Sequence, residues 1–188
     1  MSEPILVGYF PKRRVLRPDW LGAPGVEEVC SVSDCIASGP GDWIHHWRHN
    51  VMGFFDSPEL AWSIVPAEER GEFILYGYEL FPWCFQAGRR VAYILESMNA
   101  TPMTPDFKPL GFDVVSRAGG FFECSPLSCN SWAQDVGANA FCLVDDLEEA
   151  DRLASIAEAE ACEPGDYYVL SVWRRGPDER AAERVLAL

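Results

Sequence analysis

The sequence predicts an α+β fold, a single domain with a mainly antiparallel sheet of five or six strands and three to five short helices. Two observations lead to this class. Apolar and aromatic segments of strand length recur along the chain, and most are not separated by the regular helices that parallel crossovers need. The 188 residues, 48% of them hydrophobic, suffice for one core, so we expect one globular domain over residues 1–188.

Six segments have the composition of strands, with β-branched and aromatic residues in short runs. They are residues 4–10, 26–33, 72–81, 110–116, 139–144 and 167–174. Residues 89–98 fit a strand or a helix equally well. Residues 99–109 contain three prolines and predict a loop. This loop is the best internal boundary, although too little chain flanks it on either side to form a second domain.

Helix starts are marked by capping residues. The pairs Ser57-Pro58 and Ser125-Pro126 each place a serine cap before a proline that suits the first helical position. Helical spacing of apolar residues predicts a helix over 42–51 and a longer one over about 147–161, each preceded or begun by an aspartate. The C-terminal residues 176–188 fit a short amphipathic helix.

Net charge and the absence of known sequence motifs reduce the number of functions that this chain could have. The chain carries 29 acids and 15 bases, a net charge of −14, which disfavours binding to nucleic acid or to an anionic membrane. No signal peptide or apolar stretch of membrane-spanning length is evident, so we expect a soluble, cytoplasmic protein. Phosphate-loop, GxGxxG, HExxH and GxSxG motifs are absent from the sequence, and we expect no cofactor.

Residues 117–130 join a predicted strand to a predicted helix, a connection that often presents functional groups. Gly119 and Gly120 permit close approach of a ligand. Cys124 precedes the predicted helix, whose partial positive charge favours a thiolate. The candidate ligand-binding or reactive residues are Arg117, Glu123, Cys124, Ser125, Cys129 and Asn130. A tight turn of buried small residues is the alternative interpretation.

A weaker hypothesis is a structural zinc site. One C-x4-C pair precedes two histidines spaced H-x3-H on a predicted helix; the four residues are Cys30, Cys35, His45 and His49. They resemble a Cys2His2 site in outline, but the cysteine spacing is long and the intervening segment short. Cys124 and Cys129 repeat the C-x4-C spacing, so a four-cysteine site is also conceivable. Seven cysteines make such coincidences easy, and we expect no metal.

Acidic residues concentrate near the C-terminus. Residues 145–166 hold nine acids and one base. A solvated helix face explains such a run, and a docking surface for a basic protein partner is the functional alternative. Glu148, Glu149 and Asp151 are the candidate partner-binding residues.

Three functions are therefore open. We favour a non-catalytic binding or inhibitor-type protein that docks a basic partner. The alternatives are a small enzyme or ligand-binding protein with its site at 117–130, and a structural zinc-binding protein. The sequence does not indicate the oligomeric state.

Overall fold

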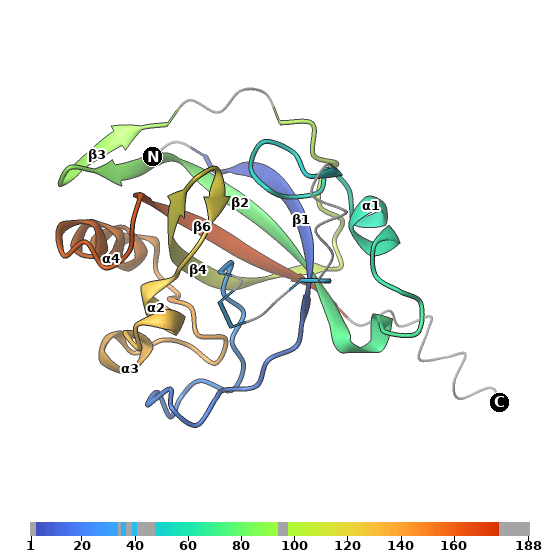
Figure 1. The fold of residues 1–188 in the computed structure, drawn as a ribbon, viewed down its shortest axis with the longest axis horizontal. Helices are drawn as coiled ribbons and strands as arrows, with labels where there is room; N and C mark the ends of the chain where they lie inside the picture. Colours follow the sequence, from blue (N-terminus) through green and yellow to red (C-terminus); the bar gives the residue numbers. More distant parts are fainter. Residues whose placement is uncertain (1–2, 34, 37–38, 41–47, 94–97, 177–188) are drawn as a thin grey trace.

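An antiparallel sheet dominates the fold (Figure 1). The computed structural model describes residues 3–33, 35–36, 39–40, 48–93 and 98–176. The strands are β1 (Ile5–Arg13), β2 (Phe73–Gln86), β3 (Arg89–Ala92), β4 (Phe107–Ala118), β5 (Phe121–Phe122) and β6 (Asp166–Arg175). Their order is β1-β2-β6-β4-β5, and β3 pairs with β2 in a hairpin.

Four α-helices accompany the sheet within the described residues: α1 (Pro58–Ser63), α2 (Pro126–Cys129), α3 (Ala133–Val136) and α4 (Leu147–Ala159). A short 3-10 helix, η2 (Arg70–Glu72), precedes β2. Sheet and helices together confirm the predicted α+β class. No helix in the described part of the chain is long and apolar enough to cross a membrane.

Helices α1 and α4 pack on one face of the sheet together with some loop residues, and the other face is covered by loops. Leu75 on β2 packs in the cluster that contains α1, and Val169 on β6 packs in the cluster that contains α4. The strand registers place these two residues on the same face. The other face carries Tyr78 and Leu170, which pack against loop residues such as Val32. The candidate site described below lies on this loop-covered face.

Two predicted strands are replaced by other structure. Residues 26–33 make only an isolated bridge at Glu28, and a buried lysine binds the carbonyl groups of residues 31–33 in place of a strand partner. Residues 139–144 form a turn around the side chain of Asn139. β4 begins at Phe107, inside the proline-rich stretch that was predicted to be a loop. The helix predicted over 42–51 lies largely outside the described residues, and the helix predicted over 176–188 lies outside them except for Gly176.

The sheet has an internal two-fold repeat that the sequence does not show at a fixed period. β1 and β2 pair in one half, β4 and β6 pair in the other, and β2 and β6 join the halves. β1 has a bulge at Gly8, which pairs with Tyr78, and β4 has one at Gly111, which pairs with Val172. Tyr78 and Val172 also pair with each other, as equivalent residues on a two-fold axis must.

Glycine is required at both equivalent positions, because in each half a turn lies in close contact with the strand. Gly8 has φ +138° and Gly111 has φ +140°. A Cβ atom on Gly8 would lie 2.6 Å from the carbonyl oxygen of Phe55, and one on Gly111 would lie 2.7 Å from that of Val144. Each glycine therefore lets a turn from its own half lie directly against the strand.

An asparagine organises that turn in each half. The side-chain oxygen of Asn50 accepts hydrogen bonds from the amides of residues 52 and 54, and its amide group donates to Val7 and Asp56. Asn139 makes the same four bonds, accepting from residues 141 and 143 and donating to Leu110 and Asp145. Ser57 directly follows Asp56 and caps α1, and Asp146 directly follows Asp145 and caps α4. The repeat therefore extends from the sheet into its connections.

We expect Asn139→Ala to lower the free energy of unfolding by roughly 2 to 4 kcal/mol, because a buried or half-buried polar group left without its partner costs about 1 to 3 kcal/mol. Asn50→Ala should have an effect of similar size. The exposed Asn130 provides the control, since Asn130→Ala should change stability by less than about 0.5 kcal/mol. Urea denaturation measures all three, and equal stability of N139A and N130A would contradict the assigned role of the turn.

Candidate functional site

The candidate site lies where two similar loop segments meet. The segment from Cys30 to Cys35 reads CSVSDC, and the segment from Cys124 to Cys129 reads CSPLSC. Each segment follows a short antiparallel pairing near the end of the first strand of its half. In the first half this pairing is the bridge between Leu16 and Glu28. In the second half it is the pairing of β4 with β5. The repeat therefore includes these two segments. Both have the pattern C-S-x-x-x-C, with a serine directly after the first cysteine and the second cysteine five residues after the first.

Two buried charged side chains hold the first segment against the sheet. Lys12 on β1 is 2% exposed, and its Nζ donates to the carbonyl oxygens of Ser31, Val32 and Ser33 at 3.2, 2.5 and 2.9 Å. Asp113 on β4 is fully buried. Its carboxylate accepts from the Ser31 hydroxyl at 2.8 Å and from the Val32 amide at 2.7 Å. Both groups come from the loop-covered face of the sheet, so one backbone segment bridges its two halves.

Asp113 also fixes the second segment, because the Ser125 hydroxyl donates to its other oxygen at 2.6 Å. Burial raises the pKa of Asp113, while its hydrogen bonds to Ser125, Val32 and Ser31 and the charge of Lys12 act in the opposite direction. One carboxylate thus receives three donors from two loops. Ser33 adds a direct link between the segments, since its hydroxyl donates to the carbonyl oxygen of Glu123 at 2.6 Å.

These contacts gather three thiols. The Sγ atoms of Cys35, Cys124 and Cys129 all lie within 4.8 Å of one another. The Sγ atoms of Cys35 and Cys124 lie 3.1 Å apart. Cys35 is exposed and the other two are half-buried, so the cluster reaches the solvent on one side. The hydroxyl of Ser33 lies 3.6 Å from the sulfur of Cys129.

Cys124 and Cys129 are not activated as nucleophiles. Burial raises the pKa of Cys124, and its hydrogen bond with Cys35 raises it further. Burial also raises the pKa of Cys129, against opposing hydrogen bonds. The four-residue helix α2 does begin near Pro126 as predicted, but Cys124 does not have the lowered pKa that the sequence suggested. Both groups are thiols at neutral pH, and a bound cation is one agent that would deprotonate them.

The other residues that the sequence singled out contribute no side chain to the thiol cluster. Arg117 donates to the carbonyl oxygens of Val51 and Gly120 and packs near the ring of Phe122. Glu123 contributes its backbone carbonyl to the cluster, and Asn130 is exposed after α2. Cys30 lies apart from Cys35, buried against Tyr76.

The members of the Cys2His2 set that lie within the described residues, Cys30, Cys35 and His49, do not form one cluster. His49 packs edge-on against the rings of Phe55 and Phe10, and His45 lies outside the described residues. Cys35 instead joins Cys124 and Cys129, which are the cysteines of the other C-x4-C pair. Three of the four residues considered for a four-cysteine site therefore converge, and the fourth, Cys30, is buried elsewhere.

The acidic helix is partly occupied by internal contacts. Asp151 accepts a hydrogen bond from the indole of Trp83 at 2.8 Å and forms an ion pair with Arg90 at 3.4 Å. Glu149 pairs with Arg152, and that contact lowers the pKa of Glu149. Glu148 is exposed. Docking of a basic partner here stays a prediction, with fewer free carboxylates than the sequence suggested.

The sequence did not single out Lys12, Asp113, Ser31 or Ser33. The sequence does contain one indication of the role of Asp113. This aspartate lies within the largely apolar segment LGFDVVS, where a strand of a covered sheet buries its side chains. Burial of a carboxylate requires partners, and two of its three donors, Ser31 and Val32, lie 82 and 81 residues away in the chain. No protein-family model, curated protein or solved structure matches this chain.

We expect Asp113→Ala to destabilise the protein by roughly 3 kcal/mol or more, since it leaves three buried donors without an acceptor. The comparison is Asp135→Ala, which removes an exposed carboxylate from α3 and should cost less than about 0.5 kcal/mol. Urea denaturation of the two variants measures the difference. Equal stability would show that the loops do not depend on this carboxylate.

Proposed function

We propose that this protein binds a zinc ion through Cys35, Cys124 and Cys129. The mutual approach of the three sulfur atoms within 4.8 Å carries the proposal. Zinc binds thiolate sulfur at about 2.3 Å, so tetrahedral ligands lie about 3.8 Å apart. The three thiols need only small side-chain adjustments to reach that geometry.

The chemistry of the cluster favours a metal over a catalytic thiol. A cysteine nucleophile needs a lowered pKa or an oriented base. Here burial raises the pKa of Cys124 and of Cys129. His49, the one histidine in the described part of the chain, packs against aromatic rings instead. Zinc binding displaces the protons of Cys124 and Cys129, which are released to water, and neutralises much of the thiolate charge.

The third thiol favours a metal over a disulfide. A bond between Cys35 and Cys124 would use two sulfur atoms and leave that of Cys129 beside them. A zinc ion uses all three and connects residue 35 of one half with residues 124 and 129 of the other. Within the described residues the cluster offers three ligands, so the fourth position is left to water or to another ligand.

We expect the protein to bind about one zinc ion per chain. Cys35→Ser, Cys124→Ser and Cys129→Ser should each weaken binding at least about 100-fold, because a thiolate ligand is lost. Cys162→Ser is the matched control, since Cys162 is half-buried and lies outside the cluster. Elemental analysis gives the stoichiometry. Replacement of zinc by cobalt should produce thiolate charge-transfer absorption that disappears in the three variants.

Two results would contradict the proposal. The first is a chain without bound zinc in which non-reducing peptide mapping finds Cys35 joined to Cys124. The second is zinc binding of equal strength in C124S and C162S. Stoichiometric copper in the elemental analysis would replace zinc as the ion and overturn that part of the proposal.

The pH dependence follows from the raised pKa values. Because the thiols of Cys124 and Cys129 are protonated at neutral pH, zinc must displace at least two protons. The apparent affinity should therefore rise with pH by about 100-fold per unit between pH 6 and 8, and fall correspondingly on acidification. Competition with a zinc-sensitive dye at several pH values measures this slope. A flat profile would show that the two thiols do not bind the ion.

A further inference from the structure

A second site is suggested by an arginine-lined cavity of about 890 Å³ at the end of the sheet where β2 begins and β6 ends. Its position is independent of the thiol cluster. Four arginines line it, Arg14, Arg70, Arg174 and Arg175, and Trp62 and Phe73 form part of its apolar wall. Four of the 15 basic residues of a strongly acidic chain thus surround one cavity.

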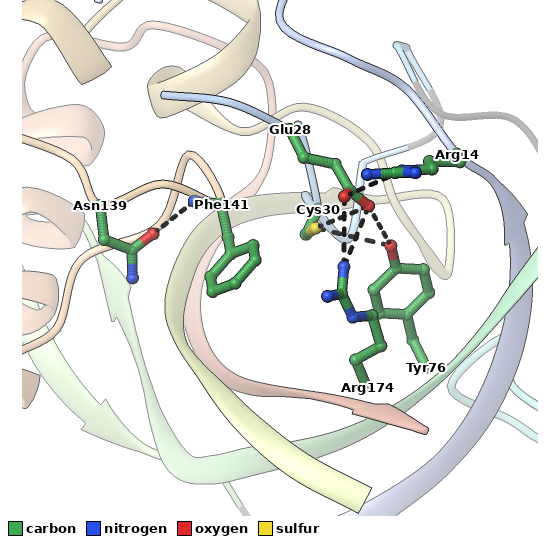
Figure 2. Close-up of polar contacts among 7 residues, drawn as sticks. All are labelled: Arg14, Glu28, Cys30, Tyr76, Asn139, Phe141 and Arg174. Atoms are coloured by element: carbon green, nitrogen blue, oxygen red, sulfur yellow. Dashed lines mark hydrogen bonds and ion pairs between the residues drawn. The ribbon is translucent and has the colours of Figure 1, made fainter. Parts of the chain in front are cut away.

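One buried carboxylate, that of Glu28, holds two of these arginines in place. Figure 2 shows the carboxylate of Glu28 between the guanidinium groups of Arg14 and Arg174, with the hydroxyl of Tyr76 beside it. Glu28 is 4% exposed, and both of its oxygens lie 3.2 Å from Nη1 of Arg174. The same Arg174 guanidinium lies over the ring of Phe141 at 5.2 Å. These contacts fix the direction of the arginine without using all of its donors.

Positive charge remains after these pairs are counted. Glu28 offsets one of the charges of Arg14 and Arg174, and Asp106 pairs with Arg175 at 2.6 Å. Arg70 is exposed, and its guanidinium contact among the described residues is the carbonyl oxygen of Trp62 at 3.5 Å. The four arginines and their two carboxylate partners therefore carry a net charge of about +2, focused by low-dielectric apolar walls.

We propose that this cavity binds a small organic anion in which a carboxylate or phosphate is attached to a flat apolar group. Guanidinium groups bind both kinds of oxyanion through paired N–H donors. Trp62 and Phe73 offer apolar surface for the remainder of the ligand. The cavity has the volume typical of sites for such molecules and combines apolar walls with a few convergent polar groups.

The probe for this site is 8-anilinonaphthalene-1-sulfonate, a flat aromatic anion whose fluorescence rises in apolar surroundings. The full-length protein should bind about one probe molecule saturably. Arg70→Gln should weaken binding about tenfold by removing an oxyanion donor. Arg152→Gln on α4 is the matched control, because it removes the same charge from an exposed position outside the cavity lining. It should leave the dissociation constant unchanged.

Competition then tests the ligand class. Naphthoate and naphthyl phosphate should displace the probe, whereas neutral naphthalenemethanol should not, and the stronger of the two anions identifies the preferred oxyanion. Circular dichroism and thermal unfolding confirm that R70Q and R152Q remain native, so lost binding is not lost folding. Equal binding by both variants, displacement by the neutral compound, or no saturable binding to the folded wild-type protein would each overturn the proposal.

Discussion

The antiparallel pairing of β2 with β6 is the constraint on which the rest of the structure depends. It is the one sheet contact between the two repeated halves in the described part of the chain, and its register places the equivalent residues Tyr78 and Val172 opposite each other. A two-fold axis through that pair directs both capped helices to one face. It also directs both loop segments to the other face, where side chains of one half can reach the loop of the other. The site therefore arises from the symmetry of the sheet, although no residue of the site lies on the axis.

The asymmetry of the candidate site comes from two positions at which the halves differ. Asp113 follows its bulge glycine by two residues, and the equivalent residue in β1 is Phe10. Lys12 follows its glycine by four residues, and the equivalent residue in β4 is Val115. One half thus supplies a buried cation and the other a buried carboxylate, and both hold the same segment. A charge buried in this way needs nearly complete hydrogen bonding, which fixes the backbone of residues 31–33 more tightly than apolar packing would.

Most of the sheet could be predicted from the sequence because its strands depend on local composition. The segments around β2, β4 and β6 are rich in aromatic and β-branched residues, and α4 has a capping aspartate and a regular apolar spacing. Residues 26–33 and 139–144 have similar composition, but their backbone groups bind Lys12 and Asn139, and these contacts depend on distant parts of the chain or on turn chemistry. The cysteine spacing indicated which segments to examine. It did not show that Cys35 would join Cys124 and Cys129 while Cys30 is buried against Tyr76, because that depends on how the two loops cross.

The segment from Glu28 to Cys35 connects the two candidate sites. At one end Glu28 orients the arginines of the cavity, and at the other end the sulfur of Cys35 lies in the thiol cluster. Lys12 and Asp113 hold residues 31–33 of this segment in place. If a metal ion at Cys35 moved Glu28, it would change the affinity of the cavity for an anion. Thermodynamic linkage then requires the anion to change the metal affinity by the same factor. The hydrogen bonds that Lys12 and Asp113 make to residues 31–33 would keep such coupling small, because they resist displacement of these residues. The structure therefore favours two sites that are each preorganised by the fold over a pair that switches together.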